Sequence, residues 1–315
     1  MVEPLLRAPE VETDRKTLRG YLMVSVAAVL FAVNGAVSKV ILTTGLSSPR
    51  LSEVRSTGAF ALLLVGILVL RPQLLRVGRR ELVLLAVFGV AGLVSVQLFY
   101  FLAIHRLDIG IALLIQFLAP LLVALWARYV MHEHVRRRIF VALALSLSGL
   151  ALMVELWRGV ALDGLGVTYA LVAAVAFAVY ILLAERAVAQ RDAFSVSCYG
   201  FFFAALFWAI AQPWWSFPTS IPGRVISLQG HLAGVHLPVW ALMTWMVVLG
   251  TVVPFALVVG ALRHLSATRA GIVAMLEPVV ATVVAYGWLA ESLSPVQVAG
   301  GLVVLAAILL AQSAR

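Results

Sequence analysis

A single carboxylate lies inside one of the most apolar stretches of the chain. The stretch AGIVAMLEPVVATVVAYGWLAE runs from Ala270 to Glu291, and it contains Glu277 directly before Pro278. A charged side chain inside a long hydrophobic segment is energetically costly and often functional. Three roles fit Glu277. It couples proton movement, it binds the ammonium group of a substrate, or it forms a structural bond to a neighbouring helix.

Prolines interrupt three of the apolar segments. They are Pro120, Pro254 and Pro278. Proline has no backbone N–H, so each one leaves the carbonyl four residues earlier without its helical partner. Such carbonyls persist in a membrane only where protein, water or a ligand satisfies them. The three helix breaks therefore predict a shared polar cavity, and the alternative is a set of packing kinks repaired by neighbouring helices.

Amides and phenols inside other apolar segments are candidates for the lining of this cavity. The candidate substrate-binding residues, with the carboxylate included, are Asn34, Gln97, Tyr100, Gln116, Tyr180 and Glu277. Gln97 and Tyr100 are three residues apart, and Gln116 and Pro120 are four apart, so each pair shares a helix face. Amides and aromatic rings suit an amino acid or a similar polar metabolite. Each residue alone also fits a hydrogen bond between packed helices.

The segments that carry these residues are long enough to cross a membrane. Of 315 residues, 63% are hydrophobic and only 12% are charged, whereas soluble domains have about 25% charged residues. A spanning helix needs about 20 mostly apolar residues. Ten segments qualify, at 20–41, 54–71, 82–104, 109–130, 138–157, 163–184, 194–215, 238–262, 268–290 and 294–312. The sequence therefore predicts an all-α polytopic membrane protein with ten transmembrane helices. Residues 1–19 are predicted to be a cytoplasmic tail and 216–237 a loop.

The distribution of basic residues predicts the orientation in the membrane. With a cytoplasmic N-terminus, 17 of the 23 Lys and Arg residues fall in cytoplasmic segments and six fall outside. Basic residues concentrate on the cytoplasmic side of membrane proteins, so both termini are predicted to be cytoplasmic. Lys39 and Arg55 lie near the outer ends of their spans, and both are expected to extend their charged groups to the interface. The alternative is that they attract an anionic group.

The chain contains an internal repeat. VAAVLFAV at Val26–Val33 matches VAAVAFAV at Val172–Val179 in seven of eight positions, at an offset of 146 residues. LAPLLVALWARYVMHE aligns with LEPVVATVVAYGWLAE at an offset of 158, which superposes Pro120 on Pro278. Two halves of five spans each, 20–157 and 163–312, must insert with opposite orientation. Inverted repeats are typical of secondary transporters, whose substrate site lies between the halves near the midplane.

The repeat and its motifs resemble a known family. Ten spans in two halves, with P-x12-E ending the fourth span and LEP-x12-E ending the ninth, resemble the drug/metabolite transporter superfamily, in particular its EamA-type exporters. The segments LFYFLAIHRLDIGIALLIQFLAPLLVAL and PFALVVGALRHLSATRAGIVAMLEP are most similar to amino-acid exporters of the threonine/homoserine type. The resemblance implies efflux of small metabolites across the cytoplasmic (inner) membrane without ATP hydrolysis. The first half departs from the second in having LAP where the second has LEP.

Several other classes of protein lack support in the sequence. The histidines of HEH at His132–His134 are two residues apart and point to different sides of a helix, so no metal site is predicted. No P-loop and no G-x-S-x-G motif occur, and we predict neither an enzyme nor a bound cofactor. The basic residues lie in gaps between spans, which argues against a nucleic-acid partner.

The sequence thus predicts a secondary carrier that works by alternating access. The expected partners are a small-molecule substrate, protons if Glu277 couples them, and the lipid bilayer. Amino acids lead the substrate classes, and drugs, nucleosides or sugars are the alternative. A channel or a non-transporting membrane scaffold is the alternative of a different class.

Overall fold

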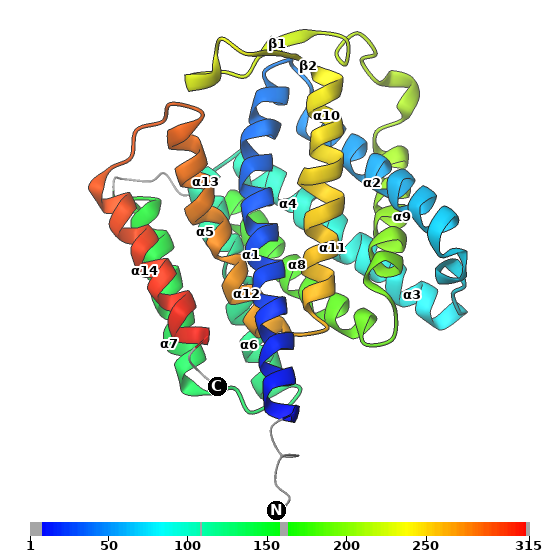
Figure 1. The fold of residues 1–315 in the computed structure, drawn as a ribbon. Coiled ribbons are helices and arrows are strands. Elements are labelled where there is room, and N and C mark those ends of the chain that lie inside the picture. The colour runs from blue at the N-terminus through cyan, green and yellow to red at the C-terminus, as the bar shows by residue number, and fades with distance from the viewer. Residues whose placement is uncertain (1–7, 108, 158–162, 313–315) are drawn as a thin grey trace, which may run out of the picture.

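The protein is almost entirely helical in a computed structural model that describes residues 8–107, 109–157 and 163–312 (Figure 1). The elements of the first half are α1 (Ala8–Leu42), α2 (Ser48–Leu70), η1 (Pro72–Leu75), α3 (Arg79–Val87), η2 (Phe88–Val94), α4 (Ser95–Ile104), α5 (Ile109–Gln116), α6 (Ala119–Tyr129) and α7 (Arg137–Met153). Those of the second half are α8 (Gly164–Val188), α9 (Ala193–Ala211), η3 (Trp214–Ser216), β1 (Val225–Ser227), η4 (Gly230–Leu232), β2 (His236–Pro238), α10 (Val239–Val247), η5 (Val248–Val252), α11 (Val253–Ala261), α12 (Ala267–Ala274), α13 (Leu276–Gly287) and α14 (Pro295–Gln312).

Most of the predicted spans recur as long apolar helices. In the described ranges, nine helical stretches are long and apolar enough to cross a membrane. The remaining one, α7, has 17 residues, which is at the short end of the lengths that span a bilayer. The predicted all-α polytopic fold is confirmed. Because α8 is the fifth span after α1, these two equivalent helices cross in opposite directions.

Three boundaries differ from the prediction. The predicted tail is helical from Ala8 onward, because Pro9 stands in the first turn, where proline is tolerated; residues 1–7 lie outside the described part. Helix α2 begins at Ser48, six residues before the predicted span, because Ser47 caps it and Pro49 lies in its first turn. The predicted loop 216–237 contains β1, and β1 pairs with β2 in an antiparallel hairpin that lies over the ends of α1 and α10 (Figure 1).

The two halves pack against each other reciprocally. The first helix of the first half, α1, contacts α11 and α13 of the second, and its repeat partner α8 contacts α4 and α5 of the first. Helix α7 packs along α14, and there a Cβ at Gly149 would stand 2.7 Å from the Gly300 carbonyl oxygen. Small residues allow such close helix contacts in membranes. The helices that carry the predicted site residues therefore meet at the boundary between the halves.

Candidate functional site

A cavity of ≈ 1010 Å³ lies between the two halves. All six predicted substrate-binding residues line it: Asn34, Gln97, Tyr100, Gln116, Tyr180 and Glu277. They come from α1, α4, α5, α8 and α13, so neither half forms the cavity alone. Small-molecule sites commonly occupy about 300–1,000 Å³, and this cavity is at the upper end of that range. Its size and polar groups suit a small polar ligand, and the binding role of each residue stays a prediction.

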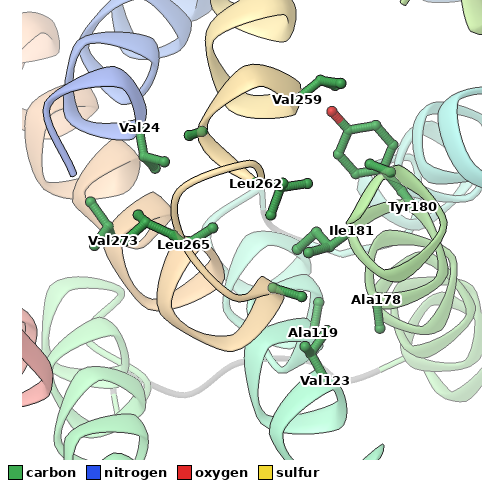
Figure 2. Packing of buried hydrophobic residues seen from close by; sticks show 14 of the residues in the cluster. Val24, Ala119, Val123, Ala178, Tyr180, Ile181, Val259, Leu262, Leu265 and Val273 are labelled. Atoms are coloured by element: carbon green, nitrogen blue, oxygen red, sulfur yellow. The ribbon is translucent and has the colours of Figure 1, made fainter. Parts of the chain in front are cut away.

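The cavity is open at one end and closed at the other. At the end near the hairpin, Lys39 Nζ and Glu291 Oε1 form an ion pair of 2.6 Å, and more than half of the Lys39 side chain and half of the Glu291 side chain are exposed. At the opposite end, Val24, Ile181 and Leu262 form the floor and are buried. Figure 2 shows the packing around these residues, where side chains of α1, α6, α8 and α12 meet around the turn after α11. The structure thus gives access to the site from the hairpin side.

Proline residues lie where the spans are interrupted. Helices α5 and α6 are separated at 117–118, just before Pro120, and α12 and α13 are separated at Met275, just before Glu277 and Pro278. Pro278 lines the cavity. Pro120 instead packs beside Gly271, where a Cβ would stand 3.1 Å from the Pro120 Cβ. Glu277 is the middle residue of the span Ala267–Gly287, so the carboxylate lies near the midplane beside a break in the helix.

The third and eighth spans each contain a π-helical turn, which the sequence analysis did not predict. These turns, η2 and η5, contain Gly92 and Gly250, which are related by the repeat offset of 158 residues. A Cβ at Gly250 would overlap the side chain of Asn34, and a Cβ at Gly92 would stand 3.2 Å from Tyr180 Cβ. Asn34 and Tyr180 are themselves repeat partners. Each half therefore has one cavity residue packed against the π-helical turn of the other half. π-Helical turns are frequent at functional sites.

Arg55 is a cavity residue that the sequence prediction misplaced. It was expected to extend to the membrane interface, but it lines the cavity instead. Because α2 begins earlier than predicted, Arg55 lies two turns inside the helix rather than at its start. Its Nε donates to Thr251 Oγ1 at 3.1 Å, and the Thr251 hydroxyl donates to the Met246 carbonyl at 2.9 Å within η5. The Ser-Ser-Pro sequence before Arg50 was the signal of the earlier helix start.

The charges of Arg55 and Glu277 interact across the cavity. Each is close enough to act electrostatically on the other, and the charge of Glu277 also acts on Tyr100. Among the residues that the structure describes, the ion pairs join other side chains, so Arg55 and Glu277 make no direct contact. A cation from one half and an anion from the other half thus line the same cavity without forming an ion pair among the described residues.

Several buried polar atoms at the cavity have no partner within the described chain. They are Asn34 Oδ1, Ser52 Oγ, Gln97 Oε1, Gln116 Oε1 and the Tyr180 hydroxyl oxygen. An unpaired polar atom in a buried position costs about 1–3 kcal/mol. Most buried polar groups in proteins are paired, so these five atoms offer unused hydrogen-bonding capacity to a polar molecule in the cavity.

The fold and the site together define a polytopic membrane transporter with its cavity between two repeated halves. The EamA-like transporter family matches residues 18–155 and again residues 164–312, and the chain belongs to this family. This confirms the resemblance to the drug/metabolite transporter superfamily. The chain is therefore a multi-pass membrane transporter of the EamA type.

Individual relatives are similar over most of the chain. An uncharacterized transporter of Archaeoglobus fulgidus is 30% identical over 80% of this chain and 84% of its own length. The threonine/homoserine exporter RhtA of Escherichia coli (strain K12) is 30% identical over 78% of this chain and 77% of its own. A solved crystal structure has a TM-score of 0.76 and 19% identity, covering 95% of this chain and 97% of that chain. At that identity the likeness shows the fold alone.

Proposed function

We propose that the protein is a secondary-active carrier that exports small polar metabolites, with amino acids as the first class of substrate. One observation carries the proposal. The six polar residues predicted from sequence, scattered over five helices, surround one cavity between the halves. The similarity to a relative named as a threonine/homoserine exporter supports amino acids over drugs, nucleosides or sugars. No energy source beyond an ion or substrate gradient is needed for this mechanism.

Alternating access follows from the proposal. The two repeats, 20–157 and 163–312, would rock against each other and expose the cavity to each side of the membrane in turn. We place the protein in the cytoplasmic (inner) membrane with both ends of the chain in the cytoplasm. In that orientation the open end beside Lys39 and Glu291 faces outward, and the packed floor of Val24 and Leu262 closes the cytoplasmic side.

Counterflow in proteoliposomes tests this function. Purified protein is reconstituted with unlabelled amino acid inside, and uptake of a panel of labelled amino acids is followed, with protein-free liposomes as the control. We expect saturable uptake of at least one amino acid. Flux that rises linearly with concentration would indicate a channel. If no amino acid, nucleoside, sugar or drug is transported, a non-transporting scaffold would be the remaining explanation.

The same assay distinguishes the three candidate roles of Glu277. The Glu277→Gln variant is compared with wild type with and without a proton gradient. If Glu277 couples protons, the variant keeps counterflow and loses gradient-driven accumulation. If it binds substrate, counterflow itself weakens. A folded variant that behaves as wild type in both modes would show that Glu277 is structural.

A further inference from the structure

We propose that Arg55 and Glu277 together recognise the charged head group of a zwitterionic α-amino acid, Arg55 binding its carboxylate and Glu277 its ammonium. The inference rests on the proposed function and assigns the residues that select the substrate. It goes beyond the sequence prediction, which favoured an interface position for Arg55 over attraction of an anionic group. The evidence is the set of hydrogen-bond partners of Arg55 and Glu277, compared with the partners of two other arginines of the same protein.

Arg50 is an example of a structural arginine whose guanidinium is hydrogen-bonded by other groups of the protein. It lies on α2, five residues before Arg55, and it is buried. Its Nη1 contacts Glu53 Oε2 at 2.7 Å and the Gln212 carbonyl at 2.9 Å, and its Nη2 donates to Ser216 Oγ at 2.5 Å. Every terminal nitrogen of that guanidinium has a protein partner, so its charge is neutralised and bonded in place.

The guanidinium of Arg191 is hydrogen-bonded in the same way at the other end of the bundle. Its Nη1 contacts Glu81 Oε2 at 2.6 Å, and its Nη2 donates to the carbonyls of Leu74 at 2.9 Å and Arg76 at 2.8 Å. In both examples, protein carboxylates, carbonyls or hydroxyls bond to both terminal nitrogens of the guanidinium.

Arg55 differs because only its inner nitrogen is bonded. Thr251 accepts from Nε and so fixes the direction of the side chain, while Nη1 and Nη2 bond to no atom of the described residues. A guanidinium presents its donors as a planar fork that fits a carboxylate with two parallel bonds. The part of Arg55 that faces the cavity therefore has the geometry and the charge for an anionic carboxylate of a ligand.

Glu277 supplies the complementary charge. Its carboxylate lines the cavity, accepts no hydrogen bond from the described residues, and faces Arg55 without a direct ion pair. An ammonium group is a compact donor that matches a free carboxylate. A molecule with a carboxylate and an ammonium group on the same carbon would bring its carboxylate to Arg55 and its ammonium to Glu277, and the site would remain neutral overall.

The proposed site also joins the two halves. Arg55 belongs to α2 of the first half, whereas Glu277 and Thr251 belong to the second. A zwitterion bound between them bridges the halves through charge-assisted bonds, which are stronger than bonds between neutral groups. A ligand with only one of the two groups leaves the opposite charge inside the span without a partner, and that is costly.

Competition in the counterflow assay tests the assignment. The labelled amino acid that gives the fastest wild-type counterflow is competed with three unlabelled compounds. These are the same amino acid, its methyl ester, which lacks the carboxylate, and its deamino acid, which lacks the ammonium. We expect each truncated compound to compete roughly 10- to 150-fold more weakly than the parent, the range for a lost hydrogen bond to a charged group.

Variants then assign each group to its residue. In Arg55→Gln the preference for the amino acid over its ester should largely disappear, while the preference over the deamino acid persists. In Glu277→Gln the pattern should reverse. Thr251→Val, which removes the bond that positions Arg55, should weaken the preference over the ester without abolishing counterflow. Size-exclusion profiles identify any variant that fails to fold. The wild-type competition series tests the head-group assignment even if no variant folds.

The outcomes separate this inference from the proposed function. If wild type transports an amino acid and both truncated compounds compete as well as the parent, the head-group assignment is wrong and the transport function stands. If Arg55→Gln keeps the full preference over the ester, Arg55 is not the carboxylate partner. If wild type exchanges no amino acid, the proposed function fails and the inference fails with it.

Discussion

Replacing Gly250 by alanine tests the contact that holds Asn34 at the cavity. Gly250 lies in the π-helical turn η5, and a Cβ there would overlap the amide of Asn34 and stand 3.0 Å from its Cβ. The amide has to rotate away, and because the Asn34 Cβ cannot follow it, α1 and η5 have to separate slightly. Such overpacking costs about 1–3 kcal/mol, offset by at most ~1 kcal/mol from the lower backbone entropy of alanine.

A double-mutant cycle isolates this contact. In an Asn34→Ala background the overlapping Oδ1 and Cγ atoms are gone and only the 3.0 Å contact to Cβ remains, so Gly250→Ala should destabilise the protein much less than it does in wild type. The expected coupling between the two sites is therefore up to about 3 kcal/mol. Gly66→Ala on α2 is the control, because a Cβ at Gly66 meets no atom within 4 Å, and it should not destabilise the protein.

Unfolding by SDS titration in mixed micelles measures the four free energies of the cycle. Equal effects of Gly250→Ala in the wild-type and Asn34→Ala backgrounds would refute the reasoning, because the substitution would then not act through Asn34. The same result would weaken the view that the π-helical turns place the cavity residues.

Two further substitutions test contacts outside the cavity in the same unfolding assay. Gly149→Val should destabilise by about 1–3 kcal/mol, because even a Cβ would stand 2.7 Å from the Gly300 carbonyl oxygen, whereas Ser148→Val on the exposed side of α7 should change little; equal effects would contradict close packing of α7 on α14. Arg191→Gln should cost about 1–3 kcal/mol, because it removes the charged donor to Glu81 Oε2 and to the carbonyls of Leu74 and Arg76. Arg106→Gln should cost at most ~1 kcal/mol, because its pair with Asp163 is nearly half exposed. A larger loss for Arg106→Gln than for Arg191→Gln would invert the expected order.

Much of the fold could be predicted because the membrane imposes simple rules on sequence. A stretch of apolar residues long enough to cross the bilayer has few structures other than a helix, so the spans could be counted. The repeat of Pro120 at Pro278 located the interrupted helices. The polar residues of the cavity could be identified because any amide or carboxylate within a span needs a reason to be there.

Other features depend on contacts that a single sequence does not reveal. Arg55 was misplaced because its role follows from where α2 begins and from the bond to Thr251, which comes from a helix almost 200 residues later. The π-helical turns escaped prediction because they differ from α-helix by a single residue of register. The hairpin escaped because its strands have only three residues each, too few to produce a recognisable alternating pattern.

Substrate protection of a single cysteine in the cavity tests the central claim most directly. The native Cys198 is replaced by serine, and Ala281→Cys is introduced, since Ala281 lines the cavity. Thr219→Cys, at an exposed position in the segment near the hairpin, is the control. The labelling rate with a hydrophilic thiol reagent is measured with and without the transported amino acid. Binding between the two halves predicts that the amino acid slows labelling at 281 and leaves 219 unchanged. Equal labelling of position 281 with and without a transported substrate would contradict the account.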